Sequence, residues 1–396
     1  MSSQNPVFIP GPTNIPDELR RAIDLPTMDH RSSAFVEILH PALAGIKRIV
    51  KLRDGEAIIF PATGTGAWEA AVTNLLSPGD TVLAARHGMF SHRWIDLCQR
   101  QGFNVEVIET EWGLGAPAGA LAVALSADKA HKIRAVLVTH NETATGVRSD
   151  VAAVRKALDT AGHPALLLVD GVSSIASMDF RMDEWGVDAA ITGSQKGFML
   201  PAGLSIVALS RKAIAAMATA TSPRCFFDFK DMLKSNASGG FPYTPPVSLI
   251  AGLAHSIRML EDEGLENVFA RHYRIAEGVR RATRAWGLAL CAKSQELYSD
   301  TVSAIVVPAN FDSTRIATHA AEKYQVAFGV GLGEVAGKVF RIGHLGSMSD
   351  VMALSGIATA EMAMVDLGLP IKLGSGVAAA QEFYRTSTSD RQARAA

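Results

Sequence analysis

The sequence predicts an α/β protein in which helices cover a mostly parallel sheet, followed by a smaller C-terminal α+β domain. Three observations lead to this prediction. Short apolar runs alternate with helix-length segments through the first two-thirds of the chain. These runs are continuously apolar rather than alternating, as expected for strands that are buried on both faces. A Gly- and Pro-rich passage at residues 238–246 then marks a change of composition, because it cannot form a regular helix.

The predicted strands of the main sheet are short runs rich in Ala, Val, Ile and Leu. There are seven of them, at residues 57–60, 81–84, 105–108, 135–139, 165–169, 189–192 and 204–209. Helical patterns lie between them, among others at residues 68–76, 91–101, 151–161 and 212–220. Strands that alternate with helices in this way favour a single parallel sheet with helices on both faces.

Beyond the Gly- and Pro-rich passage, a long helical pattern runs over residues 247–263 and ends at Gly264, a suitable C-cap. The remainder predicts a small α+β domain with strands at 302–307 and 339–342. Four prolines within the first 16 residues predict an extended arm. The chain is therefore expected to comprise an N-terminal arm (1–16), a large domain (17–246), a linking helix (247–265), a small domain (266–385) and a flexible tail (386–396).

The composition excludes several classes of protein. Hydrophobic residues make up 48% of the 396 residues and charged residues 19%, which is not the signature of disorder. Lys and Arg total 38 against 39 Asp and Glu, so no broad positive surface for nucleic acid or an anionic membrane is expected. No apolar run reaches the roughly 18 residues of a membrane span, and the N-terminus lacks a secretory signal.

Metal and disulfide sites are not expected either. The three cysteines have no CxxC spacing, which argues against a disulfide framework and a Cys-rich zinc site. The histidines do not form the HxxxH spacing that places two ligands on one helix face. We expect a cytoplasmic protein that holds no metal.

A strand, a Gly/Thr turn and a helix follow one another at residues 60–69 (FPATGTGAWE). Backbone N–H groups at such a helix start, with the hydroxyls of Thr63 and Thr65, can bind a phosphate. The segment is not a Walker A motif, because no Gly-Lys-Ser/Thr follows, and Glu69 stands where GxGxxG requires its third glycine. By itself it can equally be an ordinary strand–helix turn.

Two charged residues stand at the ends of apolar strands. Asp170 follows LLLV (166–169), where open α/β sheets bind ligands, although such a residue can also cap a helix or bind magnesium. Lys196 lies between Gly193 and Gly197 after another strand. Most lysines are solvated surface groups, but one among small residues at a strand end can be desolvated, which makes its amine a nucleophile. One helical stretch and one strand separate the two residues, so we expect both at the same sheet edge.

These features together ask for a cofactor with a phosphate, a carbonyl and a ring nitrogen. Pyridoxal 5′-phosphate has all three. The Asp170 carboxylate would keep the pyridine nitrogen protonated, and Lys196 would bond the aldehyde and then carry a proton to and from the substrate.

Longer ordered motifs resemble those of the class V aminotransferases, in particular their serine–glyoxylate and alanine–glyoxylate branch. The resemblance runs from PGPTN (10–14) to RIGHLG (341–346) and includes THNETATG (139–146), VDGVSS (169–174), FRMDEWGVD (180–188), TGSQKGFMLP (192–201) and YTPP (243–246). The strongest match is to the bacterial serine–glyoxylate type. The resemblance implies a fold-type I transferase, with a mostly parallel seven-stranded sheet covered by helices in its large domain.

The resemblance also implies roles for residues around the cofactor. Lys196 is implied to carry it covalently, and Asp170 to face its pyridine nitrogen. Phe90 stands where the family usually stacks an aromatic ring, often Trp, on the cofactor; Phe keeps the stack without an indole N–H. Other implied cofactor contacts are Thr63, Gly64 and Thr65 at the phosphate with Gln195, and Thr143 near the ring hydroxyl.

Substrate and partner contacts follow from the same resemblance. Arg341 would clamp the substrate α-carboxylate by a bidentate pair, and Asn14 and Gly11 would line the substrate pocket. Tyr243 and Thr244 would reach the phosphate of a neighbouring subunit, which implies a homodimer or a dimer of dimers.

The implied reaction is a ping-pong transfer of an amino group from an L-amino acid to glyoxylate, which yields glycine. The resemblance favours L-serine as the donor, giving hydroxypyruvate. L-aspartate, giving oxaloacetate, is the alternative, and L-alanine is a weaker one. A second donor carboxylate would need another cation, for which Arg31, Arg86 and Arg93 are candidates without an assigned place.

Two other functions are compatible with such a fold. A cysteine desulfurase needs a nucleophilic cysteine on a mobile loop, but Cys291 lies in the strand-like segment LALC and no cysteine follows it. A non-catalytic binding protein could keep the fold, but it would have no reason to keep Lys196, Asp170 and Arg341 together.

Overall fold

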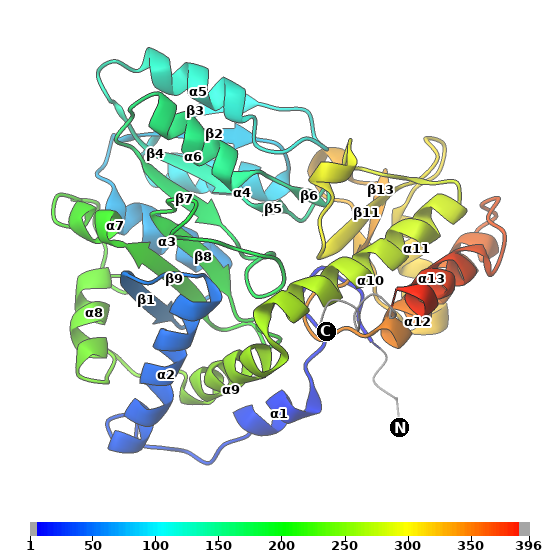
Figure 1. Cartoon of the computed structure of the whole chain (residues 1–396), viewed down its shortest axis with the longest axis horizontal. Helices are drawn as coiled ribbons and strands as arrows, with labels where there is room; N and C mark the ends of the chain where they lie inside the picture. The colour runs from blue at the N-terminus through cyan, green and yellow to red at the C-terminus, as the bar shows by residue number, and fades with distance from the viewer. Residues whose placement is uncertain (1–5, 388–396) are drawn as a thin grey trace.

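The computed structural model describes residues 6–387 and contains a large domain and a small domain that lie side by side (Figure 1). The large domain is built on one seven-stranded sheet and the small domain on one four-stranded sheet. The expected α/β architecture with a second α+β unit is confirmed.

The large sheet contains all seven strands predicted from the sequence. They are β1 (Gly55–Phe60), β2 (Thr81–Arg86), β3 (Asn104–Glu109), β4 (Ile133–Thr139), β7 (Leu166–Asp170), β8 (Ala189–Gly193) and β9 (Ser205–Ser210). Their order is β1-β9-β8-β7-β4-β2-β3, and β9 alone runs antiparallel to its two neighbours. The central strands are fully buried because helices cover both faces, which explains their unbroken apolar sequences.

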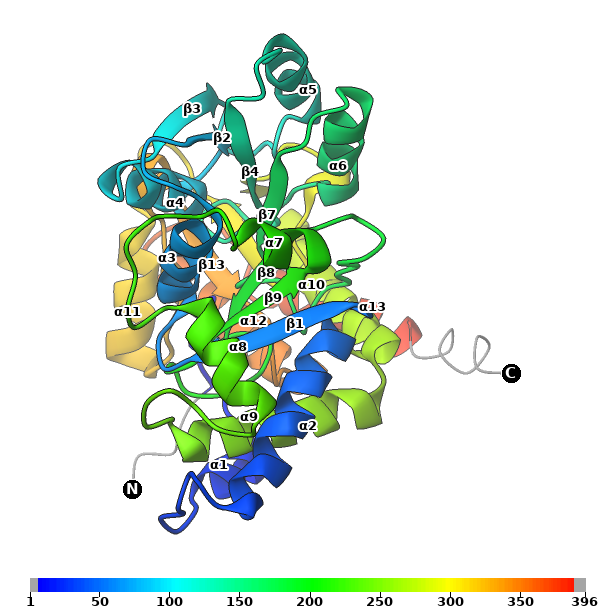
Figure 2. The ribbon, with the colours of Figure 1, turned by 90° about the vertical axis from the view of Figure 1, so that its left-hand side faces the viewer.

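Two apolar clusters separate the faces of this sheet. Ile59 and Leu167 point into one cluster, whereas their neighbours Phe60 and Leu168 point into the other, as the alternation of side chains along a strand requires. The first cluster lies under α2 (Ser33–Ile49), α5 (Ala118–Ala127), α6 (Val151–Thr160) and α9 (Val247–Glu263). The second lies under α3 (Gly64–Leu75), α4 (Met89–Arg100), α7 (Arg211–Ala216) and α8 (Phe229–Ala237). Figure 2 shows α3 and α4 on one side of the strands and α2, α5 and α6 on the other.

Two helices differ in detail from the sequence prediction. The helix expected over 212–220 is wrong at its end, because α7 stops at Ala216 and a turn and loop follow. The helix expected over 247–263 is confirmed as α9, and Gly264 ends it with φ of 82°. The next helix, α10 (Leu265–Ala285), spans both domains: Val268 packs in the large-domain core, and Ile275 packs in the small-domain core.

The small domain is an antiparallel sheet covered by helices. Its strands lie in the order β10 (Ala289–Leu290), β11 (Val302–Val306), β13 (Val339–Gly343) and β12 (Gly329–Val330). Around them pack α10, α11 (Thr314–Tyr324), α12 (Asp350–Asp366) and α13 (Ser375–Thr386). The hairpin of β5 (Asn141–Glu142) and β6 (Val147–Arg148) reaches from the large domain to this domain, where β6 lies beside the short helix η1 (Gln295–Leu297) (Figure 1).

The N-terminal arm is bound to the small domain. The Phe8 N–H donates to the Ala327 carbonyl at 2.8 Å, and the Gly343 N–H donates to the Phe8 carbonyl at 2.6 Å. The Phe8 ring is buried and lies 5.8 Å from the Phe328 ring. From there the arm runs back across the large domain to α1 (Asp17–Ile23), so it connects both domains. Of the predicted tail, residues 388–396 lie outside the described residues.

Neither a membrane span nor a metal cluster is present within residues 6–387. No helix there is long and apolar enough to cross a membrane. No group of three or more His, Cys, Asp or Glu side chains in that range is arranged to hold a metal ion.

The packing of the arm predicts that Phe8→Ala destabilises the protein. Removal of this buried ring leaves a cavity between the arm and the small domain, so the free energy of unfolding should fall by about 3 kcal/mol in urea denaturation. Val123→Ala on α5 is the control, because that side chain is 73% exposed; its change should stay within about 0.5 kcal/mol. Equal losses in the two variants would contradict a structural role for the arm.

Candidate active site

Asp170 and Lys196 meet at one edge of the large sheet, as the sequence predicts. Strands β7 and β8 are parallel neighbours in which Asp170 pairs with Ile191. Asp170 is the last residue of β7, and β8 ends at Gly193, three residues before Lys196. The carboxyl ends of the two strands therefore hold the carboxylate and the amine close enough for their charges to interact.

Lys196 is buried beneath the N-terminal arm. Its ammonium donates a hydrogen bond to the Pro10 carbonyl, and a Cβ added at Gly11 would lie 2.6 Å from its Nζ. Burial, with the nearby Arg341 charge, lowers the pKa of Lys196 to about 8, although Asp170 acts in the opposite direction. About a fifth of this amine is therefore neutral at pH 7.4, against about a thousandth for an ordinary lysine, and only the neutral amine is a nucleophile.

Gly11 is necessary at this position for two reasons. Its φ of 96° lies in the region that disfavours L side chains, and the Lys196 side chain occupies the space that a Cβ would need. Asn14 has a different part: its side-chain amide donates to the Val7 carbonyl and accepts from the Val7 N–H, each at 2.9 Å. Asn14 thus folds the arm back on itself.

Asp170 is a buried carboxyl group that accepts a 2.9 Å hydrogen bond from the Val172 N–H. Burial raises its pKa to about 7; this hydrogen bond lowers the pKa, and the Glu142 charge raises it further. Such a carboxyl is prepared to pair with a positive ring nitrogen, because that charge would compensate its burial.

The Gly/Thr turn is open at the start of α3. Thr63 is the N-cap, yet its hydroxyl makes no capping hydrogen bond, and Gly64 and Thr65 are the first helical residues. The first N–H groups of a helix have no intrahelical partner, so they can bind a phosphate. The buried Gln195 Oε1 has no hydrogen-bond partner among the described residues. A Cβ added at Gly193 would lie 2.9 Å from this oxygen and 3.4 Å from the Gly64 nitrogen, so both atoms lie next to Gly193. The structure therefore brings Gln195 to this turn.

Phe90 lies at the first turn of α4, where Glu142 fixes its backbone. The Glu142 carboxylate is fully buried and accepts from the N–H groups of Phe90, Ser91 and Ala144 at 3.0–3.2 Å. The sequence analysis missed Glu142. The sequence does contain a signal for it, because Glu142 is the one charged residue in the segment 138–147. An isolated charge among apolar and neutral residues that become buried has a partner or a function.

Thr143 belongs to a buried polar network rather than standing alone. Its hydroxyl donates to the Ser173 hydroxyl at 2.7 Å, and the Asn141 amide donates to Ser173 at 2.8 Å and to Thr301 at 2.9 Å. The network joins the β5–β6 hairpin to the turn after Asp170 and to the small domain.

Arg341 projects from β13 of the small domain into the same site. Its Nε donates to the Val330 carbonyl and its Nη1 to the Thr143 carbonyl, both at 2.9 Å. A guanidinium has five donors, so donors remain for a bidentate pair with a carboxylate. Burial lowers the pKa of Arg341 to about 10, Glu142 raises it, and the Arg93 charge lowers it.

Tyr243 and Thr244 lie within the Gly- and Pro-rich passage. The Tyr243 hydroxyl donates to the Phe226 carbonyl, and the two rings stack at 4.5 Å between centroids. Thr244 is exposed, and so are Thr63 and Thr65 at the phosphate turn. Within residues 6–387, neither Tyr243 nor Thr244 forms a hydrogen bond with the turn at residues 63–65.

Cys291 is part of the small-domain sheet. It continues the strand pairing of β10 by donating its N–H to the Ala304 carbonyl, and burial raises the pKa of its thiol.

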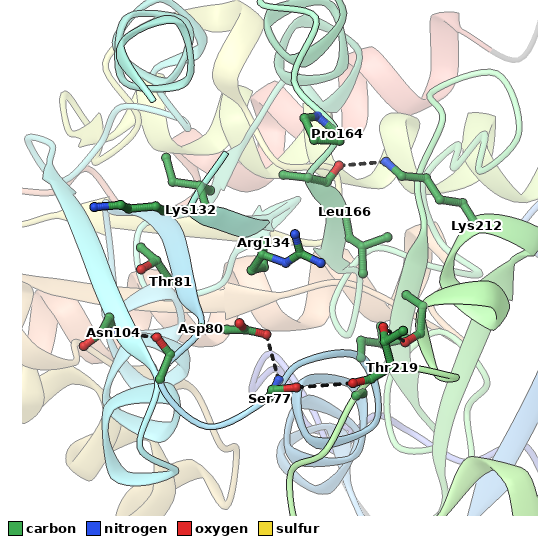
Figure 3. A pocket seen from close by; sticks show the side chains of 16 residues that line it. Ser77, Asp80, Thr81, Asn104, Lys132, Arg134, Pro164, Leu166, Lys212 and Thr219 are labelled. Atoms are coloured by element: carbon green, nitrogen blue, oxygen red, sulfur yellow. Dashed lines mark hydrogen bonds between the residues drawn. The ribbon is translucent and has the colours of Figure 1, made fainter. Parts of the chain in front are cut away.

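A cavity of 700 Å³ opens at the opposite, amino-terminal edge of the large sheet, around Thr81, Arg134 and Leu166 (Figure 3). Ligands of open α/β sheets bind at the carboxyl ends of the strands, where Asp170 stands.

The residues of the site fit pyridoxal 5′-phosphate. A buried amine, a buried carboxyl with a raised pKa and an uncapped helix start match its aldehyde, ring nitrogen and phosphate. When bound, the cofactor withdraws electrons from the substrate Cα. The residues that would hold it are Lys196, Asp170, Thr63, Gly64, Thr65 and Gln195, with Phe90 and Thr143 at its ring.

The Aminotransferase class-V family model matches residues 20–339, and the chain therefore belongs to the class V aminotransferases, which depend on pyridoxal 5′-phosphate. Over 396 residues it is 67% identical to an L-aspartate–glyoxylate aminotransferase of Paracoccus denitrificans, with 100% of both chains covered. It is 54% identical to a serine–glyoxylate aminotransferase of Hyphomicrobium methylovorum over 98% of both chains. A solved pyridoxamine–pyruvate aminotransferase of Mesorhizobium loti superposes with a TM-score of 0.90 at 27% identity, covering 98% of this chain and 99% of that one. The expected family, fold and cofactor are confirmed.

The raised pKa of Asp170 predicts a pH-dependent cost in the cofactor-free protein. The pKa of Asp170 is about 7 in the folded protein, and its ordinary value is 3.8. Between pH 3.8 and pH 7 the folded state therefore holds a proton on Asp170 that the unfolded chain has lost. Stability from this group therefore falls as the pH rises toward 7. The difference in the free energy of unfolding between Asp170→Asn and the wild type should shift by about 3 kcal/mol in favour of the variant from pH 5 to pH 8. Urea unfolding of both apoproteins at the two pH values measures this, and parallel pH profiles would contradict it.

Proposed function

We propose that this chain transfers the amino group of L-aspartate to glyoxylate, which gives oxaloacetate and glycine. Glyoxylate as acceptor is supported by both relatives described above, whose names contain it. The donor rests on one observation: the L-aspartate–glyoxylate aminotransferase is 67% identical over the full length, whereas the serine–glyoxylate aminotransferase is 54% identical. The serine donor favoured by the sequence motifs thus becomes the second candidate.

The buried residues supply the steps of such a transfer. Arg341 would bind the α-carboxylate of the donor through its free guanidinium donors, which places the donor Cα beside Lys196. Lys196, with its lowered pKa, would remove the Cα proton of the donor and deliver a proton to C4′ of the cofactor, and would carry a proton in the reverse direction with glyoxylate. The donor leaves as a 2-oxo acid before glyoxylate enters. Glyoxylate then binds Arg341 through its one carboxylate, takes up the amino group and leaves as glycine.

We also propose that a second copy of the chain completes the site. Thr63 and Thr65 are exposed in the single chain although they open the phosphate turn. Thr244 is exposed as well, so it is available to the corresponding turn of a neighbouring copy. A symmetric dimer would then form two sites at one interface.

Lys196→Ala should abolish steady turnover, because no other buried amine stands beside Asp170 among the described residues. Glycine formation from aspartate and glyoxylate should fall by more than about 10³-fold, as loss of an acid–base group and of a covalent attachment predicts. Lys212→Ala is the matched control; this lysine donates to the Ala165 carbonyl at the opposite edge of the sheet. Unchanged turnover in Lys196→Ala would refute the assignment and favour a non-catalytic protein.

A half-reaction tests the donor directly. With no acceptor present, the visible absorption band of the bound cofactor should bleach rapidly with aspartate and slowly with serine. The reverse order would make the protein a serine–glyoxylate aminotransferase. A protein that shows no such band after incubation with pyridoxal 5′-phosphate would overturn the cofactor assignment.

A further inference from the structure

The amino donor of the proposed reaction has a second carboxylate for which the site residues described so far offer no cation. L-aspartate has two carboxylates, whereas serine and glyoxylate have one each. Arg341 offers the donors for one carboxylate, and its Nε and Nη1 already bond to backbone carbonyls. A donor with two carboxylates therefore calls for a second cation at the same mouth.

Arg93 is placed to be that cation. It lies three residues after Phe90 on α4, so the two side chains share a helix face. The Arg93 guanidinium carbon lies 5.4 Å from the centroid of the Phe90 ring, and such stacking holds the planar group while its N–H edges stay free. Glu142 in turn fixes the Phe90 backbone from below.

Arg93 also stands within electrostatic range of Arg341. Its charge is one of the groups that lower the Arg341 pKa. Arg93 lines a 460 Å³ cavity together with Thr65 at the start of α3. Glu69 and the ion pair of Asp96 with Arg100 line the same cavity, so Arg93 is the arginine there without a carboxylate partner among the described residues. Two guanidinium groups whose charges interact repel each other, and a dianionic ligand that binds to both would remove this repulsion.

The neighbouring arginines Arg86 and Arg100 already pair with carboxylates, whereas Arg93 pairs with none in the described part of the chain. Arg86 is paired with Glu109, and Arg100, on α4, is paired with Asp96 at 3.6 Å. Within residues 6–387, Arg93 forms no ion pair. Arg31 belongs to the loop between α1 and α2, which lies at the lower edge of the molecule in Figure 1, away from the small domain that carries Arg341. Of the three arginines without an assigned place, Arg93 is thus the one that lies close to Arg341 within one chain.

We propose that Arg93 binds the side-chain carboxylate of the amino donor and thereby selects aspartate over serine. This inference rests on the proposed function, since it names the residue that reads the donor. Arg341 binds the α-carboxylate in both half-reactions. Arg93 is used only in the first, because glyoxylate has no second carboxylate.

The test compares Arg93→Met, Arg93→Lys and Arg100→Met, each loaded with the cofactor. In Arg93→Met the second-order rate constant for bleaching by aspartate should fall about 10- to 100-fold, as expected for loss of one charge-assisted pair. The rate constants with serine and with glyoxylate should change less than about threefold. Arg93→Lys should recover part of the aspartate rate, and Arg100→Met, on the same helix, should match the wild type.

A binding measurement supplies a readout that is independent of turnover. Succinate is a dicarboxylate without an amino group, so it occupies both cations without reacting. Calorimetry should show its dissociation constant rising about 10- to 100-fold in Arg93→Met and remaining unchanged in Arg100→Met.

Failure of this inference and failure of the proposed function give different results. A wild type that reacts with serine and not with aspartate overturns the proposed donor. A wild type that prefers aspartate, with Arg93→Met equally selective, overturns the role of Arg93. Equal losses with aspartate, serine and glyoxylate, or loss of bound cofactor, would make Arg93 a phosphate ligand or a structural residue and would also overturn it.

Discussion

The site depends on the parallel pairing of β7 with β8. This pairing carries a carboxylate at the end of one strand and a lysine just beyond the end of the next to a common edge of the sheet. Backbone hydrogen bonds of a buried sheet set the separation of the two groups, so little side-chain freedom has to be lost to bring them together. The phosphate turn after β1, the hairpin after β4 and the loop after β8 are then arranged around this pair.

Burial of charge gives the site its reactivity and also its cost. Asp170, Lys196 and Arg341 are each shifted toward the neutral form by desolvation. A cofactor and a substrate that bring complementary charges would offset this cost. The burial that makes the empty protein less stable at this place therefore adds to the free energy of binding there. Glu142 shows the same principle: it is a fully buried carboxylate that three backbone N–H groups and a helix start hold in place.

The two domains are joined at the site by more than the connecting helix. The arm packs Phe8 into the small domain and then covers Lys196 with Pro10 and Gly11. Arg341 reaches from the small domain to the Thr143 carbonyl of the large domain. Any relative movement of the domains would therefore move Arg341 with respect to Lys196.

The sequence by itself determined the seven strands and the pair Asp170 and Lys196, because apolar periodicity and strand-end position are local properties. It also determined the family, through long ordered motifs. It did not determine where the domains divide: α9 packs in the large-domain core, and α10 passes from that core to the small one. Only the tertiary structure decided that Arg93 stacks on Phe90, that Asn14 pairs with Val7 within the arm, and that the buried Glu142 binds the Phe90 backbone. These facts depend on contacts between segments far apart in the chain, and local sequence patterns carry no information on which distant groups such side chains will meet.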